Sequence, residues 1–81
     1  MTSGPVKRSV RIAGHRTSLS LEPQFWDALK QVATLRGLSV SALIAQIDEG
    51  RQHVNLSSAI RIFLFREAAE GRLGNKPRIS G

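Results

Sequence analysis

The chain has 81 residues and a net charge of +6, and 41% of its residues are hydrophobic. This length predicts one small domain, and such domains need disulfides, a metal or a second chain to supplement a limited core. Because the sequence has no cysteine, disulfides and thiolate zinc sites are excluded, and we expect a homodimer. No apolar run reaches about 20 residues, as a membrane span needs. The first residues also lack the apolar segment of a signal peptide, so we expect a cytoplasmic protein without a membrane partner.

The basic charge is concentrated towards the two ends of the sequence. Residues 1–21 contain four basic residues and no acidic one, and residues 71–81 contain three, whereas acidic residues outnumber basic ones in residues 22–50. Such asymmetry is typical of proteins that bind nucleic acid or an anionic membrane surface. A membrane surface is disfavoured, because no Trp or Phe is interleaved with the basic ends. Basic ends that serve only solubility are the alternative.

The predicted elements begin with a strand over residues 15–21. We interpret residues 1–14 as a basic N-terminal arm, with a short strand over 9–12 as an option. Residues 15–21 alternate with a period of two, which predicts one buried and one polar face. The buried face holds Thr17, Leu19 and Leu21, and the polar face holds Arg16, Ser18 and Ser20.

Two amphipathic helices are predicted after the strand. Pro23 suits the first position of a helix, and Gly37 suits the position just after its end. Ser39 is a good N-cap for the second helix, which stops near Gly50. The residues predicted to form the core are Leu19, Leu21, Phe25, Leu29, Val32, Leu43, Ile44 and Ile47.

A third helix is predicted over residues 57–70, after a connector that begins at residue 51. It has two apolar stripes: Ile60, Phe63 and Leu64 form one, and Ile62, Phe65 and Ala69 form the other. A helix that is apolar on two sides needs cover on two sides, which we expect a second chain to supply. A buried strand over residues 60–65 is the alternative, although the helix formers around this run favour the helix. Residues 71–81 are predicted to be a basic, flexible tail.

No catalytic or metal site is predicted. His15 and His53 have no carboxylate at a spacing that would orient them, and no cluster of three metal ligands exists. The glycine-rich loops that bind phosphates or dinucleotides are also missing from the sequence. We therefore expect no enzymatic activity, no catalytic residue, no metal and no cofactor.

The order of these elements resembles a known family. The segments that carry the resemblance are RTSLSLEP at 16–23, FWDAL at 25–29 and RGLSVSALI at 36–44. Over roughly residues 15–50 they are similar to the ribbon-helix-helix family of DNA-binding proteins, which includes the Arc-, MetJ- and CopG-type repressors. The GHRTS segment at 14–18 and the third helix resemble a subgroup of small bacterial members.

The resemblance implies a fold and a function. The fold would be mostly α with one short strand, in an intertwined homodimer whose two strands pair into an antiparallel ribbon between subunits, with a third helix added. The ribbon would enter the major groove of double-stranded DNA. We therefore expect a sequence-specific DNA-binding protein, associated with the nucleoid, that acts as a transcriptional repressor or regulator. Higher oligomers on DNA are compatible with this expectation.

The resemblance also assigns the residues that would contact DNA. Arg16, Ser18 and Ser20 would meet base edges, and Arg16 is able to bind guanine through two hydrogen bonds. The alternative for Arg16 is an ion pair with Glu22. The start of the second helix would hold a phosphate through its backbone N–H groups. The residues expected to contact phosphates are Ser39, Val40, Ser41, Arg36, Lys7, Arg8 and Arg11.

Two features depart from the minimal family pattern. Thr17 occupies an inward strand position where an apolar residue is more usual, and residues 1–14 and 57–70 lie outside the minimal motif. The family also contains antitoxins, which bind a toxin through the segment after the second helix. A protein-interaction module that binds a protein partner through residues 51–81 is therefore the alternative function.

Overall fold

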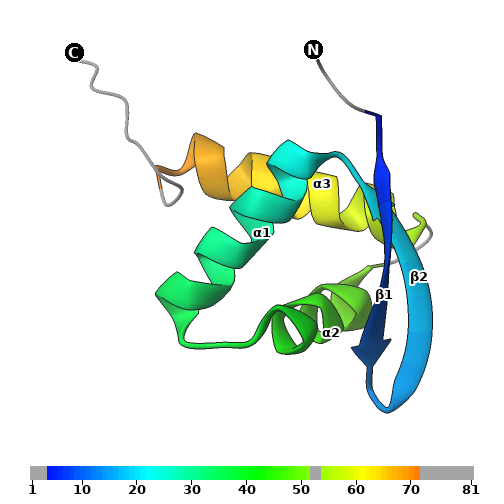
Figure 1. Cartoon of the computed structure of the whole chain (residues 1–81). Coiled ribbons are helices and arrows are strands. Elements are labelled where there is room, and N and C mark those ends of the chain that lie inside the picture. Colours follow the sequence, from blue (N-terminus) through cyan, green and yellow to red (C-terminus); the bar gives the residue numbers. More distant parts are fainter. Residues whose placement is uncertain (1–3, 52–53, 72–81) are drawn as a thin grey trace, which may run out of the picture.

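The computed structural model describes residues 4–51 and 54–71 of the chain. In these ranges the order of elements is β1 (Val6–Ile12), β2 (His15–Leu21), α1 (Pro23–Arg36), α2 (Val40–Gly50) and α3 (Leu56–Ala69). The two strands form a hairpin along one side of the three helices (Figure 1). His53 and nearly all of the predicted basic tail lie outside the described residues. None of the helices described is long and apolar enough to cross a membrane.

The hairpin corrects the expectation of a single strand. β1 pairs with β2 of the same chain in antiparallel register, from Val6 opposite Leu21 to Ile12 opposite His15. The Ala13–Gly14 step is a tight turn in which both residues have positive φ, 51° and 84°. Two-residue turns of this kind match the twist of paired strands. β2 therefore has a partner strand within its own chain, and the strand in the expected arm begins at Val6.

The helices pack their predicted faces into one core. Seven of the eight predicted core residues are buried, and Phe25 is only half-buried. Its neighbour Trp26 is buried in its place, and the Trp26 indole Nε1 donates a hydrogen bond to the carbonyl oxygen of Val6 at 3.1 Å. This bond attaches the first residue of β1 to the first turns of α1. A side chain that is apolar but carries one N–H donor suits such a position.

Helix α3 closes the core within the chain. The predicted helix is confirmed, and Asn55 caps it by accepting a hydrogen bond from the Ser58 amide at 2.8 Å. Ile60 and Leu64 of the first predicted stripe are buried, whereas Phe63, its third member, is half-buried. The second stripe is uncovered in the single chain, with Ile62 47% exposed and Phe65 72% exposed.

Two ion pairs hold α3 against the preceding elements. Arg61 binds the Glu22 carboxylate through Nε at 3.0 Å and Nη2 at 2.9 Å. Arg36, at the end of α1, binds the buried Glu67 carboxylate of α3 at 3.0 Å. Since each guanidinium also lies over a phenylalanine ring, both ends of α1 are joined to α3 by charge and by stacking.

Candidate nucleic-acid interface

The two faces of the hairpin follow from its register. Residues that lie opposite each other in an antiparallel pair point to the same side of the sheet. Leu19 and Leu21 are buried, so the residues that alternate with them lie on the other side, together with their partners on β1. We call this side the outer face, and it consists of Lys7, Ser9, Arg11, Arg16, Ser18 and Ser20.

The outer face is basic. It holds three cations and three hydroxyl groups but no carboxylate, and all its residues except the half-buried Ser20 are exposed. Arg11 and Arg16 lie directly opposite each other, and like charges in this position destabilise a strand pair. None of the three cations forms an ion pair with a described residue. An anion placed over this face would relieve the repulsion.

Arg16 does not form the alternative ion pair with Glu22. The Glu22 carboxylate is bound by Arg61 instead, at 2.9 Å. The pKa of Glu22 is lowered from its ordinary value, first by a hydrogen bond from its own backbone amide and then by the Arg61 guanidinium. Its negative charge is therefore held at the start of α1, and the Arg16 guanidinium remains exposed at the turn end of the ribbon.

Arg8 lies on the inner side of the hairpin, away from the other basic residues of β1. It pairs with Leu19, and its guanidinium lies over the Trp26 ring at 5.2 Å from the centroid. This geometry is a cation–π contact that covers one face of the indole. Arg8 therefore has a packing role that the sequence did not reveal, and a phosphate contact would require it to leave the ring.

Arg36 also has a packing role in the structure. Its Nη2 atom lies 3.0 Å from Glu67 Oε2, and its guanidinium lies 5.2 Å from the centroid of the Phe63 ring. A contact with phosphate would compete with an ion pair to a buried carboxylate. Removing one partner from such a pair is costly, because the other charge is left uncompensated.

The start of α2 has the local geometry that was expected. Ser39 caps the helix, and its Oγ accepts a hydrogen bond from the Ala42 amide at 3.0 Å. The backbone N–H groups of Val40 and Ser41 lie in the first turn, where an α-helix provides no partner for them. However, α2 runs towards the hairpin, so its first turn is the end of this helix that lies farther from the strands (Figure 1). One chain therefore does not bring the start of α2 and the outer face together.

The sequence indicated that Arg16, Ser18 and Ser20 share one face of a strand. It did not indicate that Lys7, Ser9 and Arg11 lie beside them. The available signal was the apolar series Val6, Val10 and Ile12 on the near side of an Ala-Gly step. Arg8 interrupts that series at an inward position, which obscured the alternation. Among the described residues, no cluster of His, Asp or Glu is suited to hold a metal.

Comparison with known proteins agrees with this architecture. A family model described as a ribbon-helix-helix domain matches residues 5–68. No curated protein matches the chain. Among solved structures, an uncharacterized protein from Bordetella pertussis Tohama I is similar, with 31% sequence identity and a TM-score of 0.68. The match covers 93% of this chain and 66% of that protein, so the chain spans slightly less than two thirds of its length.

The family match includes both strands and almost all of α3, whereas the order of elements predicted for the core of the family covers roughly residues 15–50. The hairpin and the third helix are therefore parts of the matched domain. With the order β-β-α-α-α and a family model over most of its length, the chain belongs to the ribbon-helix-helix family, whose fold is that of DNA-binding regulators.

Proposed function

We propose that this protein binds double-stranded DNA in a sequence-specific manner, as a homodimer, and acts as a transcriptional repressor or regulator. The observation that carries the proposal is the outer face of the hairpin, which presents three cations and three hydroxyl groups without a carboxylate. A two-stranded ribbon fits the major groove, where base pairs differ in their donors and acceptors. Among the described residues, no other face of a helix or strand presents a comparable row of basic residues outside ion pairs.

The residues of the outer face divide into two roles. Arg16 is proposed to read guanine through its O6 and N7 atoms, and Ser18 and Ser20 to contact neighbouring base edges. Lys7 and Arg11 are proposed to bind phosphates on either side of the groove, since contacts to the backbone position a ribbon without specifying sequence.

The proposed homodimer explains how the start of α2 could also reach DNA. In one chain the first turn of α2 is the end of that helix that lies farther from the strands (Figure 1). We propose that a duplex that lies on one ribbon meets the Ser39–Ser41 N–H groups of the second chain. Two-fold symmetry of the protein would then be matched by two half-sites in the operator.

The decisive experiment compares two arginines of the same hairpin. A preferred duplex is first selected from a random pool, and affinity is then measured for this duplex and for a scrambled one. Arg16→Ala should lose about 1–3 kcal/mol on the selected duplex and relax the preference at one base of each half-site. Arg8→Ala is the matched control, because its guanidinium lies on the inner side over Trp26. We expect this control to lower the free energy of unfolding and to keep the discrimination between duplexes.

A salt series tests the phosphate contacts separately. Replacing both Lys7 and Arg11 with Ala should weaken binding to both duplexes alike and reduce the slope of log K against log salt by roughly 0.9 for each phosphate that the variant no longer neutralises. If Arg16→Ala discriminates between the duplexes as well as the wild type does, the ribbon does not read bases. A protein-interaction module that binds its partner through residues 51–81 would then be the better proposal; the structure describes residues 51 and 54–71 of that segment.

A further inference from the structure

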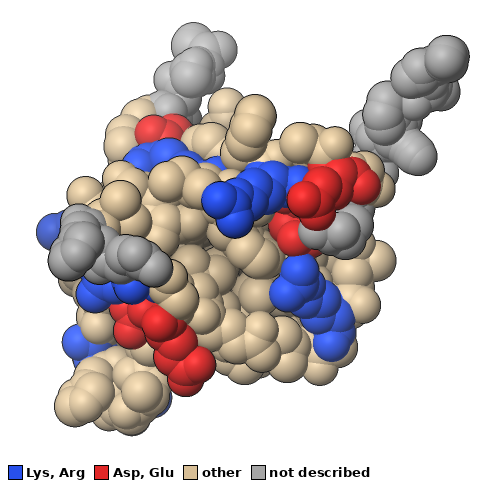
Figure 2. Space-filling model, turned by 180° about the vertical axis from the view of Figure 1, so that it is seen from behind, with Lys and Arg blue, Asp and Glu red and all other residues tan. Residues whose placement is uncertain are grey.

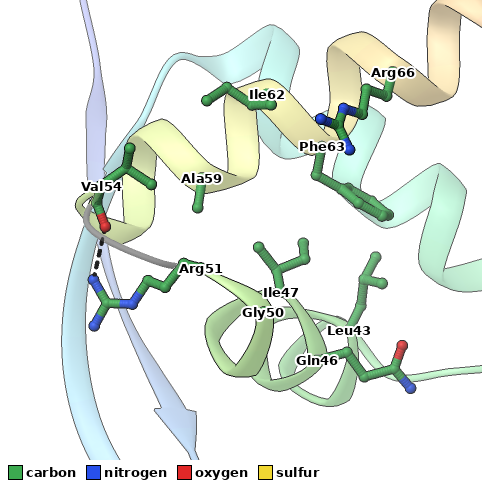
Figure 3. A pocket seen from close by; sticks show the side chains of 10 residues that line it. All are labelled: Leu43, Gln46, Ile47, Gly50, Arg51, Val54, Ala59, Ile62, Phe63 and Arg66. Carbon is green, nitrogen blue, oxygen red and sulfur yellow. Dashed lines mark hydrogen bonds between the residues drawn. The ribbon is translucent and has the colours of Figure 1, made fainter.

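Hollows in the surface lie on two sides of α3. The first, which we call the α2–α3 hollow, has a volume of about 430 Å³. Its walls are mainly apolar and include Leu43 and Ile47 from α2 and Ala59, Ile62 and Phe63 from α3 (Figure 3). The second, of about 530 Å³, lies between α1 and α3. Binding sites for small molecules usually have volumes of about 300–1,000 Å³ and mainly apolar walls with a few polar groups.

The arginines that line the two hollows differ in whether a carboxylate neutralises them. In the α1–α3 hollow, Arg61 is bound by the Glu22 carboxylate at 2.9 Å. In the α2–α3 hollow, Arg51 is bound by the Asp48 carboxylate at 2.7 Å. Arg66 also lines the α2–α3 hollow, but it forms no ion pair with a described residue. The α2–α3 hollow therefore has an arginine whose charge is not balanced.

Arg66 and Arg51 lie at opposite ends of the α2–α3 hollow (Figure 3). Arg51 is held at its end, because its Nη1 atom also donates a hydrogen bond to the carbonyl oxygen of Val54 at 3.2 Å. Arg66 belongs to the last turns of α3, and its side chain is exposed. Most of the wall between the two arginines is apolar. The hollow therefore fits a ligand that has one anionic group for Arg66 and an apolar body.

The charges favour a small anion with a single charge over a polyanion. The face seen from behind is a hollowed, mostly uncharged surface with separate blue and red groups around it (Figure 2). Nucleic acids are held by several cations in a row, whereas Arg66 supplies one unbalanced charge here. A carboxylate is the anion that a guanidinium binds through two parallel hydrogen bonds, and such bonds are stronger than those between neutral groups. Burial of the apolar body would add the remaining affinity.

We infer that the α2–α3 hollow binds a small amphipathic carboxylate, that is, a fatty or aromatic acid. Its carboxylate pairs with Arg66, and its apolar body lies against Ile47, Ile62 and Phe63. The ligand balances the charge of Arg66 and covers the apolar wall that the chain leaves open. This site shares no residue with the outer face or with residues 39–41, so it goes beyond the proposed DNA contacts and does not depend on them.

The test is a titration of the full-length protein with octanoate, followed by the backbone amide signals in NMR spectra. Octanoate should bind saturably, and the signals that shift most should belong to the α2–α3 hollow, such as those of Ile47, Ala59 and Phe63. Octanamide is the matched ligand, because it has the same chain without the charge, and it should bind roughly tenfold more weakly. Acetate has the charge without the apolar body and should cause no saturable shift.

Variants of Arg66 test the ion pair directly. Arg66→Gln should weaken octanoate binding roughly tenfold and leave octanamide binding unchanged, because only the carboxylate loses a partner. Arg66→Lys keeps the charge and should keep most of the affinity for octanoate. Lys30→Gln is the matched control, since Lys30 is an exposed cation of α1 that lines neither hollow and forms no ion pair with a described residue. It removes the same charge and should leave octanoate binding unchanged. Gln and Lys are good helix formers, so the spectra of the free variants should show the same fold.

Several outcomes would overturn the inference. Shifts that spread over the whole apolar surface, or that concentrate in the α1–α3 hollow, would show that octanoate binds elsewhere. Equal affinities for octanoate and octanamide, or octanoate binding that Arg66→Gln does not weaken, would show that Arg66 does not hold the carboxylate. A wild-type protein without saturable binding would show that the hollow is not a site for this class, for example because another chain covers it. Since no DNA is present in the titration, these outcomes leave the DNA-binding proposal to its own test.

Discussion

Arg8 and Arg16 show how strongly the position of a residue in the hairpin decides its role. Both are arginines in strands, and both were expected to contact DNA. The register places Arg8 opposite Leu19, where it stacks on Trp26, and places Arg16 opposite Arg11, on the outer face. Because neighbouring residues of a strand point to opposite sides, a shift of β1 by one residue would move Arg8 to the outer face.

The lowered pKa of Glu22 predicts that the stability of the protein depends on pH. Its pKa is lowered in the folded protein by its own backbone amide and by Arg61. A carboxyl group whose pKa is lower when folded stabilises the protein above its unfolded pKa, near 4.5, and this contribution is lost as the pH falls through the folded pKa. We therefore expect Glu22→Gln to lower the melting temperature near neutral pH.

The measurement for Glu22 is the melting temperature of wild type and Glu22→Gln from about pH 7 down to about pH 2. The difference between the two proteins should shrink as the pH falls below about 4.5, because protonated Glu22 has lost the same interactions. A difference that stays constant over the whole range would show that the ionised carboxylate does not contribute. Asp27→Asn is a suitable control, since Asp27 is exposed and no described ion pair includes it.

The hairpin is the element whose pairing partner the sequence left undecided. The alternation of residues 15–21 shows that a strand exists, but it does not say which chain supplies the neighbouring strand. The Ala13–Gly14 turn decides this within the chain, because both residues adopt the left-handed conformation that closes a two-residue loop.

The conformation of this turn predicts how substitutions at residues 13 and 14 change the stability of the protein. Ala13→Asn should stabilise the protein by roughly 0.5–1 kcal/mol, because Asn tolerates a positive φ better than Ala does and Asn-Gly favours this turn. Gly14→Ala should destabilise it by about 1 kcal/mol, since the backbone there has a φ of 84° although a Cβ would meet open space. Chemical denaturation at several protein concentrations measures both effects. Neither substitution should matter if residues 13–14 are extended and the strands pair only between chains.

Helix α3 completes the hydrophobic core of the chain. Leu29 and Ile44 are fully buried, one from α1 and one from α2, and α3 contributes Ile60 and Leu64 to the same cluster. We expected that a chain of this length needs a second copy to cover α3. The chain itself covers one side of this helix. The first stripe of α3 is largely covered inside the chain, and the second is exposed in the single chain.

At this scale we predict that Leu29→Ala and Ile44→Ala each lower the free energy of unfolding by about 2–5 kcal/mol, because each leaves a cavity in a closed core. Leu35→Ala, at an exposed position of α1, should change it by no more than about 0.5 kcal/mol. Urea denaturation gives these values directly. Equal effects at Leu29 and Leu35 would mean that α1 packs through a different face.

The sequence by itself determined the helices, their inward faces and the polar face of the second strand. These depend on local periodicity and on the residues at helix ends, such as Ser39 and Asn55, which act without reference to the rest of the chain. Tertiary structure alone decided which side of the hairpin Lys7, Arg8 and Arg11 occupy. It also decided that Trp26 rather than Phe25 enters the core, and that Arg36 and Arg61 form ion pairs that join the two ends of α1 to α3. The hydrogen bond of Trp26 and these ion pairs join residues 20 to 39 positions apart in the sequence, whose pairing is set by packing and not by any local pattern.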